Sequence, residues 1–322
     1  MNDLTERQLM TRAAWLYYVG GLNQEAASAR LGLTRARVNK LLAQAREIGL
    51  VSITINDRDV GMLPVAEALR REFGLELCIA TPAIELPPGP GLEGYPMRAV
   101  GAAAAQLLRQ ELQQRSELVV GTGWGRTLAQ MARQMSGLSA PKARFTSLMG
   151  SLTANSAVNP FEVVQSLALA TGGEGYFLPV PFIADNTADR DTLIAQRAVA
   201  RPLELARYAD LALISVGEMR EGSLLRQSGM ISADELSELR AAGAVGDTNG
   251  LFFDAKGQLV DHPLARRTIA VGFQDLRRAR TIVLAAGLDK VPATLALLRS
   301  GIAKGLIIDG DTALALQKEA GL

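Results

Sequence analysis

The chain has 322 residues, of which 48% are apolar and 21% charged, and its formal net charge is +1. This composition is typical of a globular protein with one large domain or two, and so small a charge neither favours nor excludes a polyanionic partner. The single cysteine, Cys78, excludes an internal disulfide and a cysteine-based zinc site, so we expect a buried thiol. Because no membrane-length apolar run and no charged-then-apolar leader is present, we expect a cytoplasmic protein that makes no membrane contact.

The first 56 residues are the basic part of the chain. They hold seven Lys or Arg and four Asp or Glu, a balance of +3, against −2 for the remainder. Three short helices are predicted there, each opened by a potential capping residue and closed by glycine, over residues 5–21, 23–32 and 34–49. The short glycine-containing turn between the last two is the helix-turn-helix pattern. Residues 50–56 alternate apolar and polar side chains, which predicts a strand that would form a short wing.

The third of these helices has two contrasting sides. One side, within about 100° of arc, is apolar and consists of Val38, Leu41, Leu42 and Ala45. The other side mixes alanines with amide and cationic side chains, which can approach a major groove closely and reach guanine, adenine or phosphate. The predicted DNA contacts are Thr34, Arg35, Arg37, Asn39, Lys40 and Gln44. The alternative interpretation is a solvated helix on a three-helix bundle.

After a polar linker over residues 57–62, short apolar strands alternate with amphipathic helices to the end of the chain. Strands are expected within residues 76–82, 116–123, 144–151, 210–219, 268–273, 281–287 and 305–310, and one helix over residues 191–209. This alternation predicts an α/β domain whose parallel sheet is covered by helices on both faces. We therefore expect two domains, residues 1–56 and residues 57–322.

The strongest candidate for a ligand site is the motif "VVGTGWGRTL" over residues 119–128. A strand ends in a glycine-rich turn there and a helix begins, so backbone N–H groups and the helix N-terminus can converge on an anion, with hydroxyls from two threonines and a cation from Arg126. The glycine spacing fits neither the dinucleotide motif nor the Walker A loop. A small phosphorylated or polyhydroxyl ligand is the hypothesis, and a tight turn without a ligand is the alternative.

Other strand ends should contribute to the same site, because ligands of open parallel sheets bind at the carboxyl ends of the strands. Those ends offer Ser151, Asp185, Asn186, Glu218, Asp247, Asn249 and Lys290. A turn role is the alternative for Asp247 and Asn249, and an exposed surface role is the alternative for Lys290. The paired carboxylates of "GEMREG" are interpreted as solvated loop.

Enzymatic chemistry finds little support in the sequence. His262 is the only histidine and is interpreted as a loop or core residue. Without a second histidine or a cysteine partner, hydrolase triads, zinc sites and histidine acid–base relays are not indicated, and we expect neither a metal nor a cofactor.

The chain resembles the SorC-type (sorbitol/sorbose-operon, DeoR-related) sugar-binding transcriptional regulators of bacteria along nearly its whole length. The resemblance rests on "YYVGGLNQEAASARLGLTRARVNKLLAQAREIGLVSITI", "VVGTGWGRTL", "GAVGDTNGLFFDAKG" and "AAGLDKVPATLALLRSGIAKGLIIDGDTALAL". It implies a winged helix-turn-helix followed by a Rossmann-like effector domain similar to sugar-phosphate isomerases. It further implies binding to operator DNA and to a sugar, polyol or sugar-phosphate effector, and assembly as a homotetramer, a dimer of dimers.

The resemblance also implies which residues hold the effector. The glycine-rich loop and Lys290 match the family's phosphate-binding elements, and Asp247 matches its "GD" motif. The full set of candidate effector contacts is Gly121, Thr122, Gly123, Trp124, Gly125, Arg126, Thr127, Asp185, Asp247 and Lys290. Two positions depart from the family: Thr248 stands where an apolar residue is usual, and residues 308–310 lack the usual acidic pair.

The leading hypothesis is therefore a regulator of a carbohydrate or polyol catabolic operon, controlled by its effector. The first alternative is a sugar-phosphate isomerase-like enzyme with Lys290 or Asp247 as catalyst, which would leave the basic helix over residues 34–48 without a role. The second alternative is an interaction module that uses DNA only as a scaffold.

Overall fold

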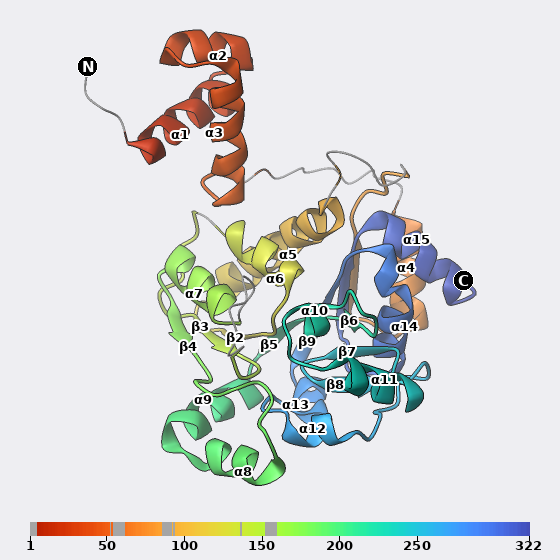
Figure 1. Cartoon of the computed structure of the whole chain (residues 1–322). Helices are drawn as coiled ribbons and strands as arrows, with labels where there is room; N and C mark the ends of the chain where they lie inside the picture. The colour runs from red at the N-terminus through yellow and green to blue at the C-terminus, as the bar shows by residue number, and fades with distance from the viewer. Residues whose placement is uncertain are drawn as a thin grey trace. The chain divides into compact units, whose positions relative to one another are not determined.

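The computed structural model in Figure 1 describes residues 5–51, 53, 62–85, 92, 94–135, 137–151 and 160–322. The chain divides into two compact units, one comprising residues 1–56 with 133–137 and the other residues 57–132 with 138–322. We call the first the head and the second the body.

The head contains the three predicted helices. They are α1 (Glu6–Ala14), continued by a π turn η1 (Trp15–Val19), then α2 (Gln24–Leu31) and α3 (Arg35–Glu47). Thr5, Asn23 and Thr34 each cap a helix, since their side chains accept hydrogen bonds from the first backbone N–H groups. The small core between the three helices consists of buried apolar side chains, mostly of alanine and leucine. The strand predicted over residues 50–56 falls largely outside the described residues.

The body is built on a seven-stranded parallel sheet in the order β1-β10-β9-β5-β2-β3-β4. Its strands are β1 (Leu77–Ala80), β2 (Val119–Thr122), β3 (Arg144–Ser147), β4 (Glu174–Tyr176), β5 (Leu211–Ser215), β9 (Arg280–Ala285) and β10 (Gly305–Ile308). The central strands are buried on both faces, as continuous apolar runs such as "LALIS" require. The predicted parallel α/β sheet is therefore confirmed.

Helices cover both faces of this sheet. Figure 1 shows α5 (Tyr95–Gln114), α6 (Arg126–Arg133) and α7 (Pro160–Thr171) on one face and α9 (Arg197–Arg207) and α13 (Phe273–Arg278) on the other, as right-handed crossovers require. The remaining helices are α4 (Leu63–Glu72), α8 (Thr187–Ala195), α10 (Leu224–Gln227), α11 (Ala233–Ala241), α12 (Pro263–Arg267), the 3₁₀ turn η2 (Leu288–Lys290), α14 (Val291–Arg299) and α15 (Gly310–Glu319).

A second, antiparallel sheet was not predicted. It consists of β6 (Gly217–Glu218), β7 (Gly246–Thr248) and β8 (Leu251–Phe253). The strand expected over residues 210–219 is wrong in its second half, because the chain leaves the parallel sheet after Ser215 and pairs with β7 instead. The β7–β8 turn is formed by Asn249 and Gly250, both with positive φ, the geometry of a type I′ hairpin.

Two further expectations differ from the structure. The single helix predicted over residues 191–209 is two helices, separated at Gln196, whose backbone is extended. No glycine or proline stands at that position, so the helical spacing of apolar residues continues across it and gives no sign of the break. Of the two helices, only α9 has buried side chains. The strand expected over residues 268–273 is reduced to two isolated bridges, at Thr268 and Ala270.

Candidate functional site

The exposed side of α3 carries most of the predicted DNA contacts. Val38, Leu41, Leu42 and Ala45 are buried in the head, as predicted. Arg35, Asn39 and Lys40 are exposed on the opposite side, and Thr34 caps the helix by accepting from the Arg37 N–H at 3.2 Å. This side of α3 can therefore approach a major groove without distortion of the head.

Two of the predicted contacts have other roles in the head. Arg37 is half-buried and forms an ion pair with Glu6, so it ties α3 to α1. Gln44 is half-buried, and its Oε1 is enclosed with no hydrogen-bond partner in the described part of the chain. Neither side chain is presented as freely as Arg35, Asn39 and Lys40.

Gln24, at the start of α2, is not among the predicted DNA contacts but touches two of them. Its Nε2 donates to Asn39 Oδ1 at 3.3 Å, and its Oε1 accepts from Arg35 Nε at 3.5 Å. One carboxamide thus bridges two candidate base-reading side chains, which restricts their rotamers before DNA is met. A glutamine that opens the first helix of a helix-turn-helix was the available signal.

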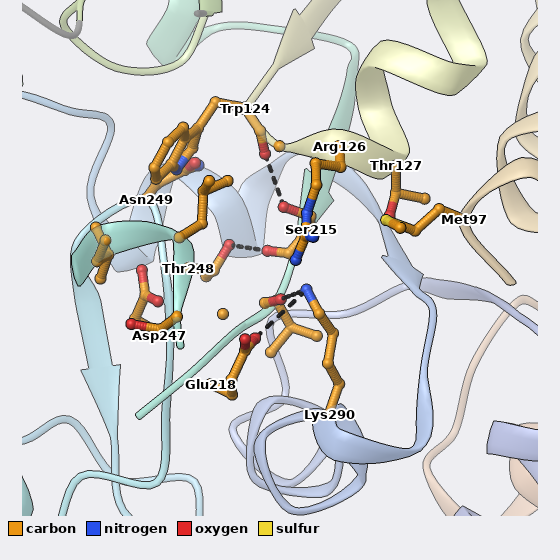
Figure 2. A pocket seen from close by; sticks show the side chains of 16 residues that line it. Met97, Trp124, Arg126, Thr127, Ser215, Glu218, Asp247, Thr248, Asn249 and Lys290 are labelled. Atoms are coloured by element: carbon orange, nitrogen blue, oxygen red, sulfur yellow. Dashed lines mark hydrogen bonds and ion pairs between the residues drawn. The ribbon is translucent and has the colours of Figure 1, made fainter. Parts of the chain in front are cut away.

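The body has a pocket at the carboxyl ends of β2 and β5 (Figure 2). Its lining consists of Met97, Trp124, Gly125, Arg126, Thr127, Ser215, Val216, Gly217, Glu218, Ser223, Leu224, Leu225, Asp247, Thr248, Asn249 and Lys290. β3 and β5 lie on either side of β2, so the chain moves toward one edge of the sheet after β2 and toward the opposite edge after β5. The pocket therefore lies at the point where the strand order reverses, the usual place for a ligand in such sheets.

The glycine-rich turn supplies one side of the pocket. Gly125 has φ +128°, and a Cβ at that position would lie 2.9 Å from Ser215 Oγ. Ser215 Oγ donates to the Trp124 carbonyl at 2.7 Å, which fixes the turn just before α6 begins. Thr127 is buried and Arg126 is exposed in the first turn of α6, where backbone N–H groups are free to bind an anion.

Four predicted effector contacts do not line the pocket. Gly121 and Thr122 belong to β2, and a Cβ on Gly121 would meet Leu148 Cδ2 at 2.4 Å, so this glycine serves packing. Gly123 is buried behind the turn. Asp185 is exposed just before α8, and its backbone carbonyl accepts from Arg267. The predicted residues that do line the pocket are Trp124, Gly125, Arg126, Thr127, Asp247 and Lys290.

A charged cluster forms the opposite side. Lys290 Nζ donates to the Val216 carbonyl at 2.6 Å and lies 3.7 Å from Glu218 Oε2 (Figure 2). Glu218 also lies 3.3 Å from Arg220 Nε. Asp247 is buried, and burial together with the charge of Glu218 raises its pKa to about 7, although Lys290 and the Gly250 N–H oppose the shift.

Close backbone approach in the small sheet makes this cluster possible. Gly217 is paired with Asp247 across the β6–β7 ladder, and a Cβ on Gly217 would lie 2.1 Å from Asp247 Oδ1. Thr248 Oγ1 donates to the Ser215 carbonyl at 2.8 Å, which holds the hairpin against the end of β5. Glu218 was noted at a strand end but interpreted as solvated, whereas its side chain is only 7% exposed.

Asp309, within the departure at residues 308–310, has a structural role. Asp309 caps α15 by accepting from the Thr312 N–H, and it also accepts from the Gly287 N–H at 2.9 Å. It is buried in these contacts and does not line the pocket. Asp309 therefore positions the loop that precedes Lys290.

His262 and Cys78 lie outside the pocket lining. His262 Nδ1 accepts from the Leu264 N–H at 3.3 Å and so caps α12. Burial raises the pKa of the Cys78 thiol to about 12, which keeps it protonated. Within the described ranges, no cluster of three or more His, Cys, Asp or Glu could hold a metal ion. In the same residues, no helix is long and apolar enough to cross a bilayer.

A helix-turn-helix head followed by an α/β body with a ligand pocket is the architecture of a ligand-controlled transcriptional regulator. Residues 57–318 match the family described as "Putative sugar-binding domain". The chain is 38% identical over 308 residues to the erythritol catabolism regulatory protein EryD of Brucella abortus (strain 2308), covering 96% of each chain. It is 31% identical over 317 residues to the deoxyribonucleoside regulator of Bacillus subtilis (strain 168), covering 98% of each.

The full-length sorbitol operon regulator SorC from Klebsiella pneumoniae has the same fold, with a TM-score of 0.71 over 97% of this chain and 99% of that one, at 23% identity. The chain belongs to the SorC-type family of sugar-binding transcriptional regulators, which confirms the resemblance found in its motifs. These relatives are named as regulators and not as enzymes, so the isomerase alternative finds no support among them.

Proposed function

We propose that this regulator binds operator DNA through α3 and that a small sugar phosphate or polyol phosphate, bound in the pocket of the body, sets its affinity for that DNA. The observation that carries the proposal is the chemistry of the pocket. Arg126, Thr127 and the N-terminus of α6 provide an anion-binding side, and the β7–β8 hairpin provides hydrogen-bonding groups (Figure 2).

The balance of charge supports an anionic ligand. Arg126 and Lys290 are cationic and Glu218 is anionic, while Asp247 is protonated below its pKa of about 7. The lining is therefore cationic by one charge when Asp247 is neutral. A phosphate group would accept hydrogen bonds from the first turn of α6 and from Arg126, and these contacts would offset the cost of removing its charge from water.

Two of the three relatives reported above favour an acyclic polyol as the ligand's carbon chain. EryD is named for erythritol catabolism and SorC for the sorbitol operon, and erythritol and sorbitol are both linear polyols. We therefore propose erythritol 4-phosphate as the first ligand to test. A ligand can change the protein's affinity for DNA only as far as it binds two arrangements of the protein with different affinity. The coupling free energy between two such sites is typically about 1–3 kcal/mol.

Replacing Arg126 with Ala should remove most of the preference for a phosphorylated ligand. The wild-type protein should bind erythritol 4-phosphate more tightly than erythritol, because a hydrogen bond to a charged group contributes about 1.5–3 kcal/mol. Isothermal titration calorimetry with both ligands measures the ratio of the two dissociation constants. That ratio should fall about 10-fold to 100-fold in Arg126→Ala.

Arg299→Ala is a matched control, since Arg299 donates to the Ala255 carbonyl on the surface, outside the pocket. It should leave both dissociation constants unchanged. Equal binding of erythritol and its phosphate by the wild-type protein would show that the pocket does not select an anion.

We also propose that the functional form is a homotetramer, a dimer of dimers. A helix-turn-helix protein reads two operator half-sites only if it brings two heads together, so a dimer is the minimum. Multi-angle light scattering at micromolar concentration should give four times the chain mass of 34.3 kDa. A monomer that persists with operator DNA present would contradict the proposal.

A further inference from the structure

Ser223 occupies a capping position but makes no capping hydrogen bond. It is the N-cap residue of α10, with the extended backbone typical of that position, yet its hydroxyl accepts nothing from the helix. The residue is 1% exposed, and its Oγ has no hydrogen-bond partner within the described residues. Serine is favoured at N-caps because its side chain accepts a backbone N–H. Here that side chain lines the pocket instead.

Asn249 is in the same situation at the tip of the β7–β8 hairpin. Asparagine is favoured at this position of the turn because it tolerates positive φ, and the φ of Asn249 is +49°. Hairpin tips are usually solvated, but Asn249 is 3% exposed and lines the pocket. Its Nδ2 has no partner in the part of the chain that the structure describes. The absence of a side chain at Gly123 makes room for Asn249, since a Cβ there would lie 2.8 Å from Oδ1.

Two buried hydrogen-bonding groups without partners are unusual in one pocket, because nearly all buried polar groups in proteins are paired. Both groups are neutral, so a neutral ligand group can pair with them without leaving a charge buried. The carboxylate of Glu218, by contrast, already lies close to the charged groups of Lys290 and Arg220. A neutral ligand group that both donates and accepts hydrogen bonds can pair with both Ser223 Oγ and Asn249 Nδ2.

We propose that Ser223 Oγ and Asn249 Nδ2 form a hydroxyl-binding subsite that reads the carbon chain of a polyol or sugar, separately from the anion-binding start of α6. Asn249 Nδ2 donates to a ligand hydroxyl oxygen, and Ser223 Oγ exchanges a hydrogen bond with a hydroxyl of the same chain. The subsite rests on the proposed function, and it names the residues that distinguish a hydroxylated effector from a simple anion.

Calorimetric titration of the full-length protein with inorganic phosphate and with erythritol 4-phosphate tests the subsite. The first probe reports the anion-binding side alone, and the second reports both sides. Ser223→Ala and Asn249→Gly should each weaken binding of erythritol 4-phosphate about threefold to tenfold, the usual effect of losing one neutral hydrogen bond. Neither variant should change the dissociation constant of inorganic phosphate. Glycine is chosen at position 249 because it keeps the positive φ of the turn.

Thermal stability without ligand separates this role from a structural one. Ser223→Ala removes a buried hydroxyl that has no partner, so its melting temperature should equal or exceed that of the wild type. Ser228→Ala is the matched control on the same helix, because Ser228 Oγ donates to the Leu224 carbonyl at 2.6 Å. That variant should lower the melting temperature and leave both affinities unchanged.

The outcomes distinguish the subsite from the function on which it rests. Unchanged affinity for erythritol 4-phosphate in both variants, with binding intact in the wild type, would overturn the subsite alone. A lower melting temperature for Ser223→Ala with unchanged affinity would identify Ser223 as a helix cap. If the wild-type protein bound neither probe, the proposed function would fail and the subsite with it.

Discussion

Replacing Asp247 with Asn should stabilise the protein at pH 8 and should remove much of the fall in its stability between pH 4 and pH 8. Asp247 is 4% exposed, and its pKa is raised from 3.8 to about 7, first by burial and then by the charge of Glu218. Its ionisation therefore opposes folding. Each pKa unit corresponds to about 1.36 kcal/mol, so the effect is up to about 4 kcal/mol.

The direction follows from the protons that each state binds. Between pH 4 and pH 7 the folded protein holds a proton on Asp247 that the unfolded chain has released. Stability linked to this group is therefore fully present below about pH 4 and is lost as the pH rises through about 7. Asparagine has a similar shape and no such proton, so the free energy of unfolding should lose this dependence.

Urea unfolding of the wild type and Asp247→Asn at pH 5, 6, 7 and 8 measures the difference. Asp261→Asn is a suitable control, because Asp261 pairs with Arg266 on the surface and its side chain is 78% exposed. Surface ion pairs contribute little, so this control should follow the wild type within about 1 kcal/mol at every pH. An Asp247→Asn variant that is less stable than the wild type at pH 8 would mean that the ionised carboxylate is stabilised by Lys290.

Local signals in the head were sufficient to predict its helices. Thr5, Asn23 and Thr34 cap them, and the chain turns at Gly32 with φ +65°, as the capping and glycine signals predicted. In the body, the alternation of apolar runs with amphipathic helices gave the parallel sheet, because that pattern depends only on neighbouring residues. Lys290 was predicted to join the same site from its place after a strand end and from the family resemblance, and it lines the pocket opposite the glycine-rich turn.

The role of each glycine in "VVGTGWG" could not be predicted from the sequence. A glycine after a strand can line a ligand, permit positive φ or leave space for a neighbour, and the letters are the same in each case. Gly125 combines positive φ with a place in the lining, Gly121 leaves space for Leu148, and Gly123 leaves space for Asn249. Both neighbours come from later parts of the chain, so only the fold reveals them.

The sequence contains a hairpin signal for the small antiparallel sheet, although only a turn was predicted from it. Asn249-Gly250 between "GDT" and "LFF" is a strong hairpin pattern. The turn role proposed for Asn249 was an alternative to a ligand role, whereas the residue both forms the turn and lines the pocket. Glu218 could not be identified as buried, because its environment depends on Lys290 and Asp247, which are distant in the sequence.

Replacing Asn39 with Ala should weaken operator binding by about 1–3 kcal/mol, the usual value of a bidentate contact with a base. Asn39 is exposed on α3, and Gln24 holds its carboxamide. Non-specific binding should change little, because it depends on phosphate contacts.

Lys40→Ala should instead weaken binding to every duplex and should reduce the slope of log affinity against log salt by about 0.9. Fluorescence anisotropy measures both, with an operator selected by the wild-type protein from random duplexes.

Gln24→Ala tests whether the bridge between α2 and α3 contributes to reading. It leaves Asn39 and Arg35 in place but frees their rotamers, so operator affinity should fall by less than in Asn39→Ala, with the salt slope unchanged. Arg37→Ala is a less direct test of reading, because Arg37 also pairs with Glu6 and so links α3 to α1. If Asn39→Ala and Lys40→Ala both bound operator as the wild type does, α3 would not be the surface that reads DNA. If Asn39→Ala instead lost affinity equally for all duplexes, Asn39 would contact the backbone and sequence would be read by other residues.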